Sequence, residues 1–376
     1  MKSTVMNRIA FVLTRMASAS LLSACFLLGM SSCGKEAARS SSIARCFVKD
    51  SCATLSCGKE KLPIDVLYPT DLLAVDTFLL VFQHHEENMI QVYGTESLKH
   101  LGSFLKKGSG PNEVVTFGLV SQWYMENGDP KVVIQSYPNY LGILNVRESL
   151  KAGQTVYDRQ YKFDTPLGKK LYQASHSVYV LDPDHLMMTK DPLRSGVEGN
   201  NNFFWEFYDC PGDKVTRQLK YEDFPWMESF LKESFRAISP DRSRVAVFYR
   251  FFDLVTVADL SSGRVTQFLP EGKSLSPAEV QDVDRRCLYY KMGRCTDDYV
   301  FGLYAGGLSV KLEDDPRYKD RNTLRIYDWE GTPLYKYDFD ERVRTFAVDE
   351  QQRYLYAVTD SDAIVRYDLK GLSAGK

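Results

Sequence analysis

One sequence pattern recurs along most of this chain: a short apolar strand, a turn that contains glycine, and a second short strand. The clearest copy has strands at residues 323–329 and 334–338 with a turn between them. Residues 254–269 and 88–104 repeat the same order. Hairpins whose turns must allow a positive φ, repeated at intervals of tens of residues, are typical of the outer half of a β-propeller blade.

The number of repeats of this pattern along the chain predicts about six blades. Their approximate bounds are residues 72–113, 117–162, 173–221, 234–269, 287–340 and 343–372. The last blade is short by one strand, and residues 62–68 are predicted to supply it, which would pair the two ends of the domain and leave no open edge. We therefore expect an all-β fold, a six-bladed β-propeller over residues 62–376 with the ring closed by an N-terminal strand joining the last blade. A pair of β-sandwiches or a jelly roll is the alternative.

Length and composition agree with this expectation. A chain of 376 residues would ordinarily suggest two or more domains, but closed β architectures often exceed the usual domain size. Aromatic residues make up 13% of the chain and favour strands, because flat rings pack well on a pleated, half-buried surface. Long helical periodicity is almost absent. Residues 225–233 and 277–283 are predicted as short helices between blades, since each opens with proline, which suits a first helical position.

The N-terminus reads as a targeting segment. Lys2, Arg8 and Arg15 precede an uncharged run at residues 16–30, which is short for a membrane span of about 20 apolar residues. Small residues then lead to Cys33, in a pattern that resembles the lipobox of bacterial lipoproteins. We expect a signal peptide over residues 1–32, lipidation of Cys33 and a flexible tether over residues 33–61, which is rich in Ser, Ala, Lys and Cys.

Two other interpretations of this segment stay open. The residues before Cys25 match the usual lipobox sequence better than those before Cys33. However, cleavage at Cys25 would leave a very short apolar core after Arg15, and an apolar triplet would remain near the N-terminus of the mature protein. An uncleaved anchor helix is disfavoured by the length of the run. With acyl chains on Cys33 the protein would be held on a membrane of the bacterial cell envelope, facing the periplasm or the cell surface.

The remaining cysteines permit disulfides without requiring them. Cys46, Cys52 and Cys57 lack the second Cys pair or the His pair that a zinc site would need, so they are predicted to be free or to form a local disulfide. Cys287 and Cys295 would form a cross-strand bridge if the chain turned tightly between them. The alternative is that both are small buried side chains.

Three short motifs carry a family resemblance. Residues 239–241 read Ser-Pro-Asp and are followed by a strand and by Asp-Leu-Ser-Ser-Gly, residues 107–113 read Lys-Gly-Ser-Gly-Pro-Asn-Glu, and residues 296–304 read Thr-Asp-Asp-Tyr-Val-Phe-Gly-Leu-Tyr. The set resembles the blade and turn motifs of TolB-like six-bladed propeller lipoproteins of Gram-negative envelopes. Asn112 and Arg242 stand where that pattern has glycine, and both departures concern the geometry of turns.

No motif predicts a metal, a cofactor or nucleic acid as a ligand. His84 and His85 are adjacent, so on a strand they would point to opposite faces, and we interpret them as part of a solvated turn. The acidic stretches at 313–315 and 359–362 supply too few oxygens for calcium and are predicted as turns. A net charge of -2 leaves no basic excess to neutralise phosphates.

The sequence leaves the ligand open. The charged insertion at residues 308–321 is interpreted as a solvated loop on one mouth of the ring, and alternatively as a ligand rim. The rim candidates are Lys311, Asp314, Asp315 and Arg317. Because no catalytic motif is present, we expect a monomeric, non-enzymatic binding or scaffold module for a peptide, glycan or protein partner. The alternatives are a hydrolase or lyase with a site in the central channel, and a structural component of outer-membrane machinery.

Overall fold

The computed structural model of the chain describes ten stretches of sequence. They are residues 43–110, 112–118, 122–137, 140–169, 178–190, 203–224, 229–312, 322–349, 351 and 353–373. The predicted signal peptide and the candidate lipidation sites Cys33 and Cys25 lie outside these residues. Within them, no helix is long and apolar enough to cross a membrane.

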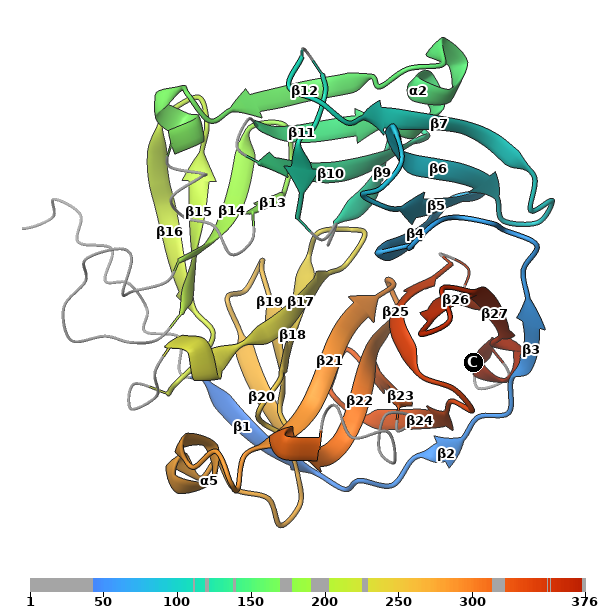
Figure 1. The fold of residues 1–376 in the computed structure, drawn as a ribbon. Helices are drawn as coiled ribbons and strands as arrows, with labels where there is room; N and C mark the ends of the chain where they lie inside the picture. Colours follow the sequence, from blue (N-terminus) through green and yellow to red (C-terminus); the bar gives the residue numbers. More distant parts are fainter. Residues whose placement is uncertain are drawn as a thin grey trace, which may run out of the picture. The chain divides into compact units, whose positions relative to one another are not determined.

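Over the described residues the strands form six sheets arranged radially, as a six-bladed propeller (Figure 1). Within each blade the four main strands are antiparallel neighbours. Blade 1 consists of β4 (Asp71–Val75), β5 (Phe78–Phe82), β6 (Asn88–Gly94) and β7 (His100–Lys106). In blade 2 the inner position is shared by β8 (Thr116–Phe117) and β9 (Trp123–Glu126), which both pair with the next strand. The other strands of this blade are β10 (Asp129–Tyr137), β11 (Tyr140–Asn145) and β12 (Tyr157–Lys162). Blade 3 consists of β13 (Val178–Val180), β14 (His185–Lys190), β15 (Phe204–Asp209) and β16 (Lys214–Lys220).

The other three blades follow the same order. Blade 4 consists of β17 (Ser234–Ile238), β18 (Arg244–Tyr249), β19 (Val255–Asp259) and β20 (Val265–Pro270). Blade 5 consists of β21 (Cys287–Cys295), β22 (Tyr299–Ser309), β23 (Thr323–Asp328) and β24 (Pro333–Asp338). Blade 6 consists of β25 (Val343–Val348), β26 (Tyr354–Thr359) and β27 (Ile364–Asp368). Four short helical pieces of the described residues lie between strands: α2 (Val146–Ala152), η1 (Ser229–Lys232), α5 (Pro277–Gln281) and η2 (Val310–Leu312). A fifth, α6 (Lys370–Ser373), follows the last strand.

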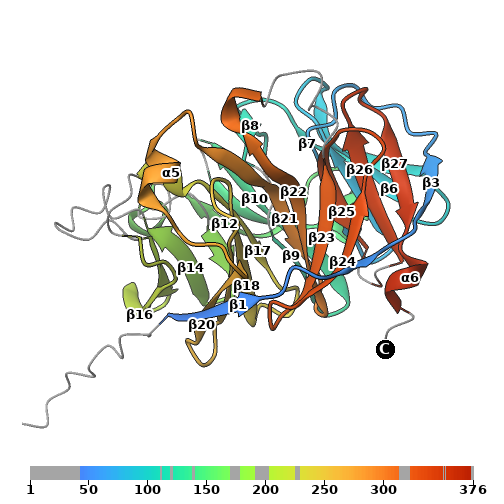
Figure 2. The same cartoon turned by 90° about the horizontal axis from the view of Figure 1, so that it is seen from below.

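The segment before blade 1 forms a strap along the outer edges of blades 4, 5 and 6 (Figures 1 and 2). Its strand β1 (Ala44–Val48) pairs in parallel with β20, and β2 (Ala53–Thr54) pairs in parallel with β24. The third strand, β3 (Gly58–Lys61), pairs antiparallel with β27 and is the outer strand of blade 6. We call residues 44–61 the N-terminal strap.

The strap corrects two predictions. Residues 44–61 were predicted as part of a flexible tether, yet the structure pairs them with three sheets, and the strand that joins the last blade is Gly58–Lys61 rather than residues 62–68. The physical reason is that an outer strand offers free main-chain N–H and C=O groups, and a polar segment satisfies them as well as an apolar one does. Side-chain composition therefore did not reveal the pairing.

Buried side chains fill the space between neighbouring blades. Every residue of β4 and β5 is buried, because strands near the centre have another blade on each side and apolar side chains can point both ways. Buried apolar residues in the described part of the chain fall into six clusters. Phe248, Tyr290 and Trp329 show the arrangement: they pack together between blades 4 and 5.

Two of the three family-like motifs lie in hairpin turns of blades 4 and 5 that contact each other. The backbone N–H of Asp241 donates to Oδ1 of Asp297 at 3.2 Å, so the Ser-Pro-Asp turn contacts the Thr-Asp-Asp turn directly. The Arg244 guanidinium lies 4.5 Å from the centre of the Trp329 ring, and the Trp329 indole N–H donates to the carbonyl of Thr296 at 3.2 Å. These motif residues therefore stabilise the fold.

The two departures from the family pattern keep the geometry of glycine. Asn112 has a φ of 62° and Arg242 a φ of 63°, both in the left-handed region where a non-glycine residue is uncommon. The guanidinium of Arg242 lies 4.4 Å from the centre of the Tyr124 ring in blade 2. The turns thus retain their shape despite the substitutions.

The structure also decides the open question about Cys287 and Cys295. They stand at opposite ends of the single strand β21, so they cannot form a cross-strand bridge. The alternative with a tight turn between them is excluded, because residues 288–294 continue the strand. All cysteines of the described residues are free thiols, and Cys295 is buried.

Candidate functional site

Of the four predicted rim residues, the structure places Lys311. It lies in η2, where its Nζ forms an ion pair with Asp284 of the connection between blades 4 and 5. Asp314, Asp315 and Arg317 lie outside the described residues. The pairing shows that the base of the blade 5 insertion reaches the neighbouring connection, which itself borders a cleft.

This cleft, which we call the blade 4–5 cleft, has a volume of about 410 Å³. It lies on the loop face, the face that carries the connections from one blade to the next. Its walls come from the β18–β19 connection, the β20–β21 connection with α5, and the start of β21. The lining residues include Phe251, Asp253, Lys273, Ser274, Ser276, Glu279, Arg285 and Tyr289.

Local sequence explains why the β20–β21 connection stands away from the blades. Gly272 has a φ of 79°, which turns the chain sharply after β20. Pro277 opens α5 and Val280 anchors it, being buried in the cluster between blades 3 and 4. Residues 273–276 therefore run between two fixed points and line one side of the cleft.

The floor of the cleft is a buried carboxylate. The Asp253 side chain is only 7% exposed, and its Oδ2 accepts a hydrogen bond from the Tyr304 hydroxyl at 2.8 Å. The Arg325 guanidinium lies 3.8 Å from Oδ1 of Asp253 and 3.0 Å from Oδ2 of Asp50 in the N-terminal strap. It also covers the Tyr304 ring at 3.6 Å. The strap therefore contributes a charge to the cluster beneath the cleft.

Burial sets the protonation behaviour of this cluster. It raises the pKa of Asp253 above the usual value for aspartate, although Arg325 and Tyr304 act in the opposite direction. It also raises the pKa of Tyr304, so this hydroxyl stays a hydrogen-bond donor at neutral pH. A carboxyl group with a shifted pKa at the bottom of a cleft is a feature of functional sites, and structural ion-pair networks share it.

The upper part of the cleft combines apolar and polar groups. The rings of Phe251 and Tyr289 lie on its walls, together with Lys273, Ser274 and Ser276. A concave site of a few hundred Å³ with apolar walls and a few convergent polar groups is typical of a site for a small ligand or a short segment of a partner. Sequence reasoning missed these residues because they come from two blades, and the only signal was the length of the connection that carries α5.

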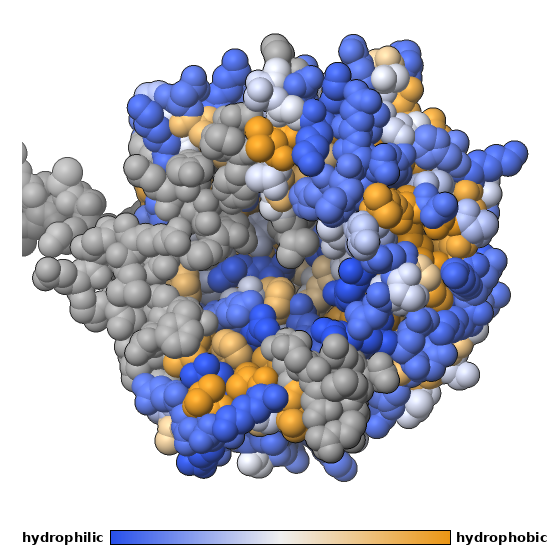
Figure 3. All heavy atoms as spheres, viewed as in Figure 1, coloured by the Kyte–Doolittle hydropathy of each residue, from blue (hydrophilic) through white to orange (hydrophobic). Residues whose placement is uncertain are grey.

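The centre of the ring is the other place where a site was expected. It is hollowed, and hydrophilic residues gather there (Figure 3). Asp71, Arg294 and Thr345, from the inner strands of three blades, bond to one another in this region. Their polar atoms therefore serve to join blades. Across the described residues, no group of three or more His, Cys, Asp or Glu side chains is placed to hold a metal ion.

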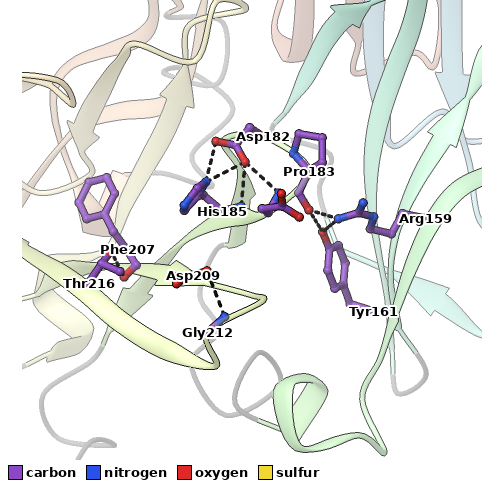
Figure 4. A network of polar contacts seen from close by, with 10 residues as sticks. Arg159, Tyr161, Asp182, Pro183, His185, Phe207, Asp209, Gly212 and Thr216 are labelled. Carbon is purple, nitrogen blue, oxygen red and sulfur yellow. Dashed lines mark hydrogen bonds and ion pairs between the residues drawn. The ribbon is translucent and has the colours of Figure 1, made fainter.

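A polar network lies between blades 2 and 3, away from the cleft (Figure 4). His185 Nδ1 lies 2.8 Å from Oδ2 of Asp182, and this hydrogen bond raises the pKa of His185. Arg159 and Tyr161 of β12 both donate to the carbonyl of Pro183 in the same turn. The network fixes a turn of blade 3 against the outer strand of blade 2. His84 and His85 lie in the β5–β6 connection, where the sequence placed them in a turn.

The fold and the cleft together define a β-propeller with a concave site on its loop face. Residues 193–351 match the family described as TolB-like 6-blade propeller-like. This part of the chain is accordingly similar to TolB-like six-bladed propellers, as its motifs indicated, and the described strands form six blades.

A solved structure shows the same fold. It is the crystal structure of a member of the duf4221 family from Bacteroides vulgatus ATCC 8482, which aligns with a TM-score of 0.53 over 85% of this chain and 98% of that one. The two sequences are 11% identical, so the likeness concerns the fold alone. No curated protein sequence matches this chain.

Proposed function

We propose that this protein is a lipid-anchored component of the bacterial cell envelope whose propeller is a binding module, and that the blade 4–5 cleft holds a peptide, a glycan or a segment of a partner protein. The observation that carries the proposal is the cleft itself. It offers aromatic walls, exposed hydroxyl and amino groups and a buried carboxylate within about 410 Å³. A hydrolase or lyase site in the central channel stays a prediction.

The position of the strap supports the anchoring part of the proposal. Nine residues lie between Cys33 and Ile43, so the chain from one to the other reaches at most about 35 Å. β1 then runs beside β20 up to Pro270, the residue that leads into the cleft. An acyl group on Cys33 would therefore hold the propeller on the membrane through a short segment that leads into β1.

Anchoring is tested by a Cys33→Ala variant produced with its full N-terminus in a Gram-negative host. The variant should move from the membrane fraction to the soluble envelope fraction and lose the mass of its acyl chains. Cys25→Ala is the matched control and should remain in the membrane fraction. If Cys25→Ala releases the protein and Cys33→Ala does not, the anchor is Cys25.

Binding is tested by placing a photo-crosslinking amino acid at position 274, which is exposed and lines the cleft. Irradiation of cells should give a discrete crosslinked species, which should disappear when Lys273→Glu reverses the charge beside it. The control is the same amino acid at position 215, an exposed site on β16 outside the cleft. Equal crosslinking from both positions, or none from position 274, would contradict the proposed binding site.

A further inference from the structure

A second cleft lies on the loop face, beside the end of blade 5. It has a volume of about 530 Å³, and we call it the blade 5 cleft. Its lining includes Gly306, Gly307, Asn322, Thr323, Asp338 and Phe339. None of these six residues lines the blade 4–5 cleft. Tyr304 also lines the blade 5 cleft, and its hydroxyl bonds to Asp253 of the other cleft.

The strongest feature of this cleft is the side chain of Asn322. The residue is only 2% exposed, yet among the described residues neither Nδ2 nor Oδ1 of its amide has a hydrogen-bond partner. The groups around it are satisfied: the Asn322 carbonyl accepts from the backbone N–H of Phe339 at 3.0 Å, and the Thr323 hydroxyl donates to Asp338 Oδ1 at 2.6 Å. Since buried polar groups are normally paired, an amide whose nitrogen and oxygen are both unpaired points to a missing partner.

The wall facing Asn322 exposes main chain. β22 pairs with β21 through Tyr304 and Tyr290, and the next pair is Leu308 with Leu288, so residues 305–307 bulge out of the ladder. Gly306 and Gly307 in this bulge both have a φ of 74°, a conformation that strains a residue with a side chain. Without side chains they leave the peptide groups of β22 uncovered at the cleft.

The blade 5 ladder ends beside this wall. β23 begins at Thr323, which pairs with Tyr304, while β22 continues through Ser309. Asn322 is therefore the residue just before the ladder, and the last part of β22 has no partner in β23. Such a strand end is a place where an extended segment can lie against main chain, with its side chains in pockets on either side.

We propose that the blade 5 cleft binds an extended peptide segment and that Asn322 recognises its main chain. In an extended chain the N–H and C=O of one residue point to the same side, as they do in a β-ladder. One side-chain amide can then bind both groups: Nδ2 donates to the peptide C=O, and Oδ1 accepts from the peptide N–H. The apolar groups of Phe339, Leu308 and Leu312 supply surface for the flanking side chains.

The geometry disfavours an acetamido sugar as the occupant. The N–H and C=O of its single trans amide point in opposite directions, so Asn322 would engage only one of them. The other half of its amide would stay unpaired. An oligosaccharide of N-acetylglucosamine is therefore the competing occupant in the test.

The test begins with a random heptapeptide library selected against the full-length protein in detergent. The best peptide is then made in versions that carry one N-methyl group each. N-methylation at one residue should weaken binding at least tenfold, and Asn322→Leu should weaken the unmethylated peptide by a similar factor. The two changes together should cost no more than either alone, because they remove the same pair of hydrogen bonds.

The stability of the ligand-free protein provides a second readout. Asn322→Leu has a similar volume and removes two unpaired buried atoms, so its melting temperature should equal or exceed that of the parent. A lower melting temperature would mean that Asn322 serves the fold, and would overturn the proposal. Thr189→Val is the matched control: Thr189 is fully buried with an unpaired hydroxyl, but it lies in blade 3. This variant should bind the peptide like the parent.

Two further results would overturn the inference. One is a selected peptide that binds Asn322→Leu and the parent equally. The other is the finding that tri-N-acetylchitotriose binds the parent, does not bind Asn322→Leu, and competes with every selected peptide. Crosslinking from position 274 reports on the blade 4–5 cleft and is unaffected by Asn322→Leu, so failure here and failure of the proposed function are distinguishable.

Discussion

Arg294 and Asp71, 223 residues apart in sequence, form a buried ion pair at the centre of the ring. Nη2 of Arg294 lies 2.7 Å from Oδ1 and 2.9 Å from Oδ2 of Asp71, whose side chain is fully buried. The Thr345 hydroxyl donates to the same Oδ1 at 2.6 Å, and Arg294 Nε donates to the carbonyl of Phe346 at 3.2 Å. One carboxylate thus joins the inner strands of blades 5, 6 and 1.

Asp71→Ala should therefore be strongly destabilising. It leaves the Arg294 guanidinium buried without its counter-charge, a change that typically costs about 3–5 kcal/mol. Urea unfolding followed by tryptophan fluorescence measures the loss. Lys151→Ala is the control, since it removes an exposed partner of Glu148 on α2, and pairs of that kind contribute at most about 1 kcal/mol. Equal effects of the two substitutions would show that the central pair does not hold the blades together.

Glu222 should make the protein less stable as the pH rises toward neutrality. Its side chain and that of Lys232 are fully buried, 3.3 Å apart, and burial raises the pKa of Glu222 to about 7. An unfolded glutamate has a pKa of about 4.3, so between about pH 4.3 and 7 the folded protein holds a proton that the unfolded chain releases. The free energy of unfolding should therefore fall across this window, by roughly 1–3 kcal/mol.

The measurement is urea unfolding at pH 5 and pH 7.5. In Glu222→Gln the side chain no longer titrates, so the difference between the two pH values should shrink. Glu148→Gln, on the partly exposed helix α2, should leave the difference as it is in the parent. An unchanged difference in Glu222→Gln would show that another group causes the pH dependence.

His185 should titrate above the usual histidine pKa of about 6.5. The hydrogen bond that His185 donates to Asp182 raises the pKa of His185, so the pair stabilises the turn fully below about pH 6.5 and loses this contribution as the pH rises through the folded pKa. An NMR titration of the imidazole signals measures the value. Asp182→Asn should return it toward 6.5, and a titration that is the same in both proteins would contradict the pairing.

The N-terminal strap should resist proteolysis. Lys59 pairs with Asp340 and Glu341, and Leu55 is buried among residues of blades 5 and 6. Trypsin should therefore cut the native protein slowly after Lys59 and Lys61, whereas a flexible tether would be cut at once. Leu55→Ala should cost about 2–3 kcal/mol and speed this cleavage. Mass spectrometry of a digestion series identifies the sites, and rapid cleavage in the parent would contradict the strap.

The blades were predictable because their signals are local. The predicted blade at residues 234–269 corresponds to β17–β20, Ser234 to Pro270, and that at 287–340 to β21–β24, Cys287 to Asp338. Each short apolar run lies within a few tens of residues of the turns that flank it. The hydrophobic effect favours burial of such a run wherever it lies in the chain. Motifs such as the Ser-Pro-Asp turn then identified the type of propeller.

The strap and the clefts were not predictable in this way. The strap pairs through main-chain groups, which every residue carries, so side-chain patterns say nothing about its partner. Beneath the blade 4–5 cleft, the hydrogen bond between Tyr304 and Asp253 spans 51 residues of sequence. No spacing rule connects such positions, because their proximity depends on how two blades pack.

By itself, then, the sequence determined that this chain builds repeated β-hairpins, that these number about six blades, and that the family resemblance is to TolB-like propellers. Only the tertiary structure decided that polar residues 44–61 pair with three blades and that Cys287 and Cys295 are held apart by one strand. It also decided that the buried amide of Asn322 has no hydrogen-bond partner among the described residues. The first set follows from patterns of side chains along the chain. The second depends on main-chain pairing and on contacts between distant segments, which exist only once the ring is assembled.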